Sequence, residues 1–371
     1  MHSRNPPLDP RKCPDRNTFW VGVKGEGRCT IGPVLHTCSS DQAWRRLSDN
    51  PASRWQSGWE IDPAEGTAWH RITSEPFFTP RVDAGFTVGA DDHIFAIGSC
   101  FAREVEGALR RLGFTVDSRT DAATFEGHEA PYPRYPHEFL NKYNPESIYQ
   151  ELQWALDPVS KFPPEALQEL PDGHWRDSMA DPVFGDGDFD RTLDLHRRLS
   201  DVMRRAADCR IVVITLGLVE VFQDTRTGLF ANTTPHLTAS PGRYEFGVLT
   251  YREVMDALER IHRLLSEHGR SDVEILVTVS PVPLSATFTG TDIVMANTYS
   301  KSLLRSAAGE WSQSNGNVHY FPSYEIVMNS ARDRAWFMDG RHVRHDMVAH
   351  VMQLFADAYA PARPLGAQRT G

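Results

Sequence analysis

The chain has 371 residues, of which 40% are hydrophobic and 24% charged, and its formal net charge is −10 at pH 7. This composition is typical of a globular protein with one large domain or two smaller ones. The acidic balance argues against a nucleic-acid-binding protein. No apolar run reaches the roughly 18 residues of a transmembrane helix. The N-terminus lacks the apolar core of a secretory signal, and the five scattered cysteines fit reduced thiols, so we expect a cytoplasmic protein.

Residues 1–90 predict an irregular N-terminal extension, because they are rich in Trp, Pro, Asp and Ser and show little periodicity. Five of the nine tryptophans lie here: Trp20, Trp44, Trp55, Trp59 and Trp69. We expect them to pack on the domain that follows; the alternative is that their faces line a ligand cleft. Cys29, His36 and Cys38 do not have the spacing of a zinc site, so no metal is expected.

Strands and amphipathic helices alternate from residue 91 to residue 360. The expected strands are residues 93–98, 209–218, 273–284 and a short one within 318–327. The expected helices are residues 103–112, 145–156, 191–207, 251–269, 297–311 and 346–359, with long loops over 115–145 and 157–190. The strands are almost wholly apolar, which is typical of a parallel sheet covered by helices on both faces. Residues 361–371 are expected to form a disordered tail.

The carboxyl ends of the strands are the expected place for a ligand, because open α/β sheets bind ligands at that edge. Three such ends stand out: Gly98-Ser99-Cys100, Gly217-Leu218 and Ser280-Pro281. The Gly-rich phosphate-binding motifs are absent from all three, so no nucleotide or other cofactor is expected.

Ser99 and Cys100 are two adjacent candidate nucleophiles in the turn between a strand and a helix. The N–H groups and positive potential of a helix N-terminus would stabilise a thiolate and an oxyanion there. Cys100 is the more nucleophilic of the two, whereas Ser99 would need a strong base. The alternative is structural, because cysteines are commonly buried and serines commonly cap helices.

The segment "IGSCFAREVEGALRRLGF" resembles the signature of the GSCFA family. The similarity continues in the same order through "ITLGLVEVF", "TVSPVPLSAT", "NTYSKSLLRSA" and "YFPSYEIVM", over residues 80–357. That family resembles the SGNH, or GDSL-like, hydrolases. The resemblance implies a flavodoxin-like three-layer α/β/α sandwich and an esterase, thioesterase or acyltransferase activity, in many such enzymes on carbohydrate esters.

The resemblance also implies roles for individual residues. Gly98, Ser99 and Cys100 fall on the Gly-Asp-Ser block, which places Cys100 at the nucleophile's position and so favours it over Ser99. Gly217 falls on the glycine of the Gly-x-Asn block, but Val219 replaces its asparagine. Backbone N–H groups and another donor, Asn144 or Asn297, would then have to bind the oxyanion.

Asp339 and His342 have the spacing of the last block, Asp-x-x-His. His342 would be the general base, and Asp339 would orient it. His345 and His350 are nearby alternatives, and a solvated loop is the structural interpretation.

Five further residues are weaker candidates than these. Ser280 ends a strand and is a candidate pocket residue. Lys301 and Arg305 share a helix face that either binds an anion or is simply solvated. Glu220 and Glu325 are candidate site carboxylates that could equally form caps or ion pairs.

The sequence therefore predicts an acyl-transfer enzyme that forms an acyl-enzyme on Cys100 or Ser99. Its expected substrate is a glycan or another small hydroxylated molecule. The alternative is a non-catalytic binding or accessory protein of the same fold in glycan or natural-product biosynthesis, favoured by the missing asparagine at position 219.

Overall fold

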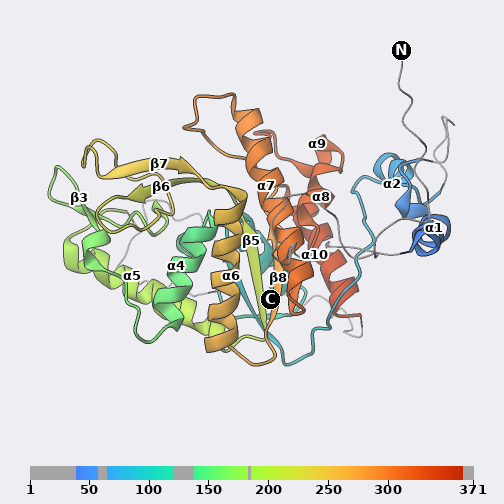
Figure 1. Ribbon diagram of the computed structural model, residues 1–371, viewed down its shortest axis with the longest axis horizontal. Helices are drawn as coiled ribbons and strands as arrows, with labels where there is room; N and C mark the ends of the chain where they lie inside the picture. The colour runs from blue at the N-terminus through green and yellow to red at the C-terminus, as the bar shows by residue number, and fades with distance from the viewer. Residues whose placement is uncertain (1–38, 57–64, 120–137, 183–184, 362–371) are drawn as a thin grey trace, which may run out of the picture. The chain divides into compact units, whose positions relative to one another are not determined.

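Residues 39–56, 65–119, 138–182 and 185–361 are described by the computed structural model (Figure 1). Trp20, Trp59, Cys29, His36, Cys38 and the expected tail after residue 361 lie outside these ranges. The chain divides into two compact units, Met1–Asn50 and Pro51–Gly371. In the first unit, helix α1 (Ser40–Asp49) begins with a capping box formed by Ser39 and Gln42.

The second unit is built around a parallel five-stranded sheet of order β2-β1-β5-β8-β9. Its strands are β1 (His93–Gly98), β2 (Thr115–Val116), β5 (Ile211–Leu216), β8 (Glu274–Val279) and β9 (Val318–Tyr320). If the five strands of this sheet are numbered 1 to 5 in chain order, the sheet order is 2-1-3-4-5, which is that of a flavodoxin-like doubly wound fold. The order reverses between β1 and β5, so the topological switch point lies between these strands.

Successive side chains of each strand point to opposite faces of the sheet and pack into two hydrophobic clusters. Ile97 and Ile214 belong to the first cluster, and Ile94 and Val213 belong to the second. The central strands β1, β5 and β8 are buried on both sides, which explains their almost continuous apolar sequences.

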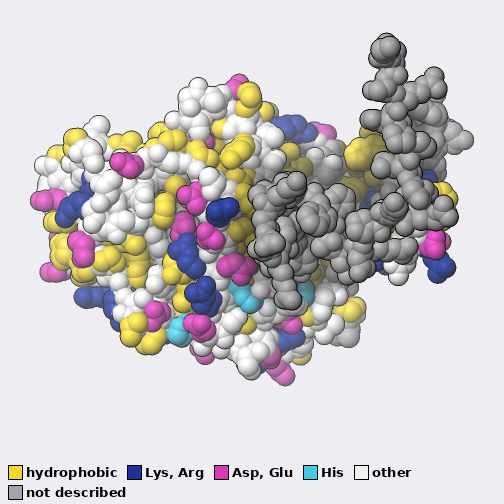
Figure 2. Space-filling model, in the orientation of Figure 1, with side chains coloured by type: hydrophobic (Ala, Val, Ile, Leu, Met, Phe, Trp, Pro, Cys, Tyr) yellow, Lys and Arg dark blue, Asp and Glu magenta, His cyan; other side chains and the backbone are white. Residues whose placement is uncertain are grey.

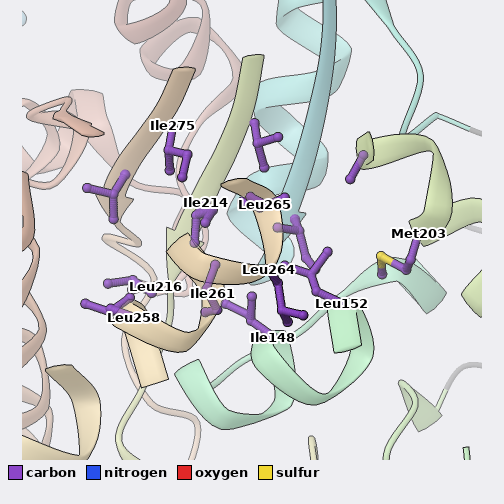
Figure 3. Close-up of a cluster of buried hydrophobic side chains, with 14 of the residues drawn as sticks. Ile148, Leu152, Met203, Ile214, Leu216, Leu258, Ile261, Leu264, Leu265 and Ile275 are labelled. Atoms are coloured by element: carbon purple, nitrogen blue, oxygen red, sulfur yellow. The ribbon is translucent and has the colours of Figure 1, made fainter. Parts of the chain in front are cut away.

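The two faces of the sheet are covered by different helices. The first cluster includes side chains of α4 (Pro145–Leu156), α5 (Phe189–Met203), α6 (Tyr251–His268) and α7 (Ile293–Ser314). The second includes side chains of α3 (Cys100–Arg111), α8 (Ser323–Met328), α9 (Arg332–Ala335) and α10 (His345–Tyr359). Figure 3 shows the first cluster, where Ile148 of α4 and Ile261 of α6 lie near Ile214 of β5. The expected three-layer α/β/α sandwich is confirmed.

Two small antiparallel hairpins and a short helix complete the second unit. The strands are β3 (Gln168–Glu169) with β4 (Trp175–Arg176), and β6 (Glu220–Asp224) with β7 (Tyr244–Val248), and the helix is α2 (Ala68–Ser74). In the view of Figure 1, β6 and β7 lie beyond the ends of α4 and α6, outside the main sheet. No helix within the described ranges is both long and apolar enough to cross a membrane.

Most elements agree with the periodicity of the sequence, and the differences are local. Helix α3 begins at Cys100, three residues before the expected start, because Ser99 already has the extended backbone of an N-cap. Residues 323–328 form a helix where only a turn is expected. The β6–β7 hairpin is not predicted, because its strands carry several polar and half-buried residues.

The described part of the N-terminal extension contributes phenylalanine rather than tryptophan to the interior of the second unit. Phe86 packs against Tyr359 with ring centroids 4.8 Å apart, and Val88 N–H donates to the Tyr359 carbonyl. Trp55 and Trp69 are exposed. Trp44, in the first unit, is exposed as well.

Candidate active site

A pocket of about 440 Å³ opens at the carboxyl edge of β1, β5 and β8. It is lined by six of the candidate site residues singled out in the sequence: Ser99, Cys100, Gly217, Glu220, Ser280 and His342. Ser280 is fully buried in the pocket wall. A second, more open depression of about 700 Å³ is lined by Trp175 and Phe189, among others, and by none of the predicted site residues. The sequence motifs therefore meet at the topological switch point of the sheet.

Two glycines allow the strand ends to approach one another closely. Gly98 has φ +136, and a Cβ at this position would collide with the carbonyl oxygen of Thr215. A Cβ at Gly217 would lie 2.5 Å from the Tyr143 carbonyl oxygen and 3.3 Å from Ser99 Cβ. The approach is fixed by backbone hydrogen bonds from Ser99 N–H to Thr215 and from Leu218 N–H to Tyr143.

Cys100 is the first residue of α3, and Ser99 is its N-cap. Cys100 is half-buried, whereas Ser99 is only 3% exposed. Ser99 makes no capping hydrogen bond, and its buried Oγ has no hydrogen-bond partner among the described residues. The N–H groups of the first turn of a helix lack intrahelical acceptors and carry positive potential, so Cys100 lies where an anion is stabilised.

His342 and Asp339 form a hydrogen-bonded pair at the pocket. His342 Nδ1 lies 2.5 Å from Asp339 Oδ2, and Asp339 Oδ1 accepts the N–H groups of Arg341 and His342. These three hydrogen bonds, that of His342 first, lower the pKa of Asp339 well below its usual range. An ionised Asp339 fixes Nδ1 as the protonated nitrogen and leaves Nε2 as the acceptor.

A cluster of Tyr143, Asn141 and Asp181 adjoins the nucleophile region and is not predicted from the sequence. Tyr143 OH donates to Asp181 Oδ2 at 2.9 Å, and Asn141 Nδ2 donates to both oxygens. Burial and the nearby Asp181 raise the pKa of Tyr143 well above its ordinary value. Tyr143 and Asp181 line the pocket, so they present a neutral phenol and a carboxylate to a ligand.

Asn232 is a buried pocket residue that the sequence analysis also misses. Its Oδ1 accepts the Tyr143 N–H and the Ser147 hydroxyl, and its Nδ2 donates to the Asn141 carbonyl. An amide nitrogen carries two hydrogens, so a second donor remains on Asn232. Its only sequence signal is a polar run, "ANTT", within a long loop.

The structure does not bring Asn144 or Asn297 into the pocket lining. Asn144 caps α4 and donates to the Ala231 carbonyl, and Asn297 accepts the Leu284 N–H. Both amides therefore support pocket loops from behind. Val219, aligned with the asparagine of the SGNH block, is fully buried in the first hydrophobic cluster, so its side chain faces the core.

Lys301 is buried, so the interpretation that it lies on a solvated helix face is wrong. It is 1% exposed, and its Nζ donates to the Gly217 carbonyl at 2.5 Å. Burial lowers the pKa of Lys301 to about 7, while the charge of Cys100 raises it and that of Arg341 lowers it. Lys301 thus lies beside the nucleophile region and does not join Arg305 in an exposed anion site.

The remaining candidates have structural partners elsewhere. Arg305 pairs with Glu325, and His345 lies 3.4 Å from Glu104. His350 contacts Phe77 and Thr79. Glu220 does line the pocket, but its carboxylate binds Thr287 Oγ1 and the Phe288 N–H, which holds the loop before α7.

Comparison with known proteins gives a family match and similarity to solved structures. One of these structures is a carbohydrate esterase family 2 enzyme with a carbohydrate-binding domain from Corynascus thermopiles (Myceliophthora fergusii). It is 14% identical, with a TM-score of 0.33 over 77% of this chain and 69% of that chain. No match is found among curated proteins. The family model of GSCFA matches residues 93–355, which include β1 and most of α10, and the chain therefore belongs to the GSCFA family.

Proposed function

We propose that the protein is an acyl-transfer enzyme that uses Cys100 as its nucleophile. One observation carries the proposal: Cys100 begins a helix at the switch point of the sheet and shares a pocket with His342, whose Nδ1 is held by Asp339. A nucleophile, a proton carrier and an orienting carboxylate are the groups that covalent acyl transfer requires.

Ser99 is the less suitable nucleophile on the same observations. Its side chain is almost completely buried, and its Oγ makes no hydrogen bond to a base in the described part of the chain. A serine hydroxyl needs a base to remove its proton, whereas a thiol at a helix N-terminus needs less activation. Cys100 is also the more exposed of the two residues.

In the first half-reaction, Cys100 Sγ attacks the carbonyl carbon of an ester. The thiol proton passes to His342 Nε2, the carbon–oxygen bond to the leaving group breaks, and His342 returns the proton to the leaving oxygen. A thioester on Cys100 and an alcohol result. The N–H groups at the start of α3 and the second amide hydrogen of Asn232 are the donors available for the oxyanion.

In the second half-reaction, water or an acceptor hydroxyl attacks the thioester. His342 takes the proton of the attacking group, the carbon–sulfur bond breaks, and the proton returns to the thiol of Cys100. Attack by water gives a carboxylic acid, and attack by an alcohol gives a new ester. Hydrolase and transferase therefore share the covalent intermediate.

The polar lining of the pocket favours a small hydroxylated substrate, such as a glycan ester. Asp181, Asn232, Thr233 and Thr234 supply carboxylate, amide and hydroxyl groups. Phe288 lies at the pocket and is 46% exposed, close in sequence to the exposed Val294 and Met295. Figure 2 shows hydrophobic side chains at the upper edge of this face, near the start of α7. An apolar rim of this kind suits the acyl part of a substrate.

The test is intact-protein mass spectrometry after incubation with activated acyl esters and thioesters. We expect an acyl adduct on the wild type and on Ser99→Ala, and none on Cys100→Ala. An adduct on Cys100→Ala that disappears in Ser99→Ala would make this a serine enzyme. A folded wild type that takes no acyl group from any ester in the panel would favour a non-catalytic binding protein.

A further inference from the structure

Lys301 is a fully buried basic side chain whose role the acyl-transfer mechanism leaves open. A buried ammonium is costly unless a counter-charge compensates it. Lys142, the other fully buried lysine of the described ranges, has such a counter-charge in Glu151, 2.6 Å from its Nζ. The hydrogen-bond partner of Lys301 is instead a neutral carbonyl, that of Gly217.

A series of contacts connects Lys301 on α7 with Cys100 through the turn after β5. Nζ binds the Gly217 carbonyl, Gly217 packs against Ser99, and Ser99 precedes Cys100. The charged groups that act on Lys301 are Cys100, from the start of α3, and Arg341, from the loop before α10. Of these, only Cys100 can carry a negative charge. Cys100 also interacts with Tyr143 and with Arg103. Arg103, however, already has a counter-charge in Glu106, 2.7 Å away.

We propose that Lys301 is the charge partner of Cys100 and holds it as a thiolate before the substrate binds. The proposal rests on the proposed function, whose nucleophile it concerns. The thiol gives its proton to the neutral amine, so that Cys100 becomes a thiolate and Lys301 an ammonium. One proton moves, no electrons are transferred, and no further reactant is needed.

This arrangement separates two tasks that a single base would otherwise perform. Lys301 lies beneath the pocket and outside its lining, so it is a positioning residue that acts through Cys100. His342 lines the pocket and is exposed, so it can exchange protons with the leaving group and with water. With the thiolate already formed, His342 in its protonated form donates to the leaving oxygen and later takes the proton of water.

The first test is the pH dependence of Cys100 alkylation by iodoacetamide, read by mass spectrometry on the full chain. Lys301→Met removes the charge and keeps an unbranched apolar side chain. We expect the midpoint of alkylation to rise by about one pH unit or more, the shift that loss of a nearby opposite charge produces. Lys301→Arg keeps a cation and should recover part of this shift.

Ser300→Ala is the matched control, because Ser300 is the neighbour of Lys301 on α7 and its Oγ accepts the Val219 N–H. It loosens the same turn without changing charge, so the alkylation midpoint should stay at the wild-type value. An equal shift in Ser300→Ala and Lys301→Met would overturn the proposal, since the effect would then be structural. An unchanged midpoint in Lys301→Met would overturn it as well.

A reciprocal measurement covers the case in which Lys301→Met does not fold. The titration of Lys301 Nζ is followed by NMR in the wild type and in Cys100→Ser. Because an anion at Cys100 favours the ammonium, its loss should move the Lys301 midpoint to lower pH. An unmoved midpoint would contradict the charge pair.

The proposal and the proposed function fail in different ways. If an ester acylates Cys100 but the pH midpoint of Cys100 alkylation is the same in the wild type and in Lys301→Met, the proposed function is supported and the charge pair is wrong. If alkylation depends on Lys301 but no ester acylates Cys100, the charge pair stands and acyl transfer is wrong.

Discussion

Gly98 ends β1 directly against Thr215 of β5, and their separation leaves no room for a Cβ on Gly98. Gly98 also has φ +136, a region that side-chain-bearing residues rarely adopt. Ser99, the next residue, donates its N–H to the Thr215 carbonyl at 3.2 Å. The position of the nucleophile thus depends on a glycine that contributes no functional group.

Gly98→Ala should destabilise the protein strongly, because backbone strain and a collision with Thr215 act together. We expect a loss of at least about 2–3 kcal/mol in the free energy of unfolding, measured by urea titration. Gly173→Ala is the control: Gly173 has φ +82, but nothing lies within 4 Å of a Cβ there. It should cost only about 1–2 kcal/mol from strain alone. Equal losses in the two variants would rule out the collision.

The parts of the site that lie within one short motif could be predicted from the sequence. Ser99 and Cys100 follow an apolar strand, which suggests a nucleophile turn, and Asp339 and His342 are suggested by their match to the Asp-x-x-His block of the family that the sequence resembles. The apolar strands and amphipathic helices likewise predict the layers of the fold, because burial on both faces leaves a strong local pattern.

The rest of the site depends on contacts between distant segments. Tyr143 and Asp181 are 38 residues apart and meet only in the folded chain, and nothing in the sequence around either residue indicates its partner. Lys301 lies on a helix face with no distinguishing pattern, and only the packing of α7 shows that it is buried. The role of Asn232 could not be predicted for the same reason, because its hydrogen bonds join segments about 90 residues apart, such as those around residues 141 and 232.

His342→Gln should abolish most turnover while leaving the fold intact, because His342 is exposed and its ring carries the proton in both half-reactions. Removal of a general acid–base lowers rates by about 10²–10⁴-fold. The measurement is steady-state hydrolysis of an activated ester that has been shown to acylate Cys100. His345→Gln is the matched control, since His345 is an exposed histidine outside the pocket lining. A similar rate loss in both variants would contradict the assignment.

Asp339→Asn should reduce turnover with little effect on stability. Asparagine can still accept the N–H groups of Arg341 and His342, but its amide group cannot accept the Nδ1 proton of His342. The imidazole then loses the partner that fixes its tautomer. We expect a fall in kcat with thermal unfolding close to that of the wild type. An unchanged kcat would mean that Asp339 only shapes the loop.

Asn232→Asp tests the amide as an oxyanion donor. The carboxylate keeps the acceptor for Tyr143 N–H but loses both amide hydrogens and adds negative charge beside the developing oxyanion. Acylation of Cys100 should slow by about 10²–10³-fold, the usual cost of one oxyanion donor. Asn297→Asp is the control, because Asn297 likewise acts as an acceptor, for Leu284 N–H, outside the pocket lining. A wild-type acylation rate in Asn232→Asp would remove the amide from the mechanism.

The burial of Lys301 predicts an unusual dependence of stability on pH. Its pKa is lowered to about 7 in the folded protein, from the ordinary 10.5, mainly by burial. Between these values the unfolded chain holds more protons than the folded one, so the free energy of unfolding rises with pH. The contribution of Lys301 to the free energy of unfolding is therefore smallest below pH 7. It increases by a few kcal/mol between pH 7 and pH 10.

The cleanest comparison is between Cys100→Ala and the double variant Cys100→Ala with Lys301→Met, because the other titrating groups cancel in the difference. Urea titrations from pH 6 to pH 10 should show the single variant gaining stability relative to the double variant as the pH rises. The gain should begin at lower pH than in the same comparison with Cys100 present, because a thiolate keeps Lys301 protonated longer. A difference that stays flat across this range would mean that Lys301 reaches solvent, and the charge pair with Cys100 would lose its physical basis.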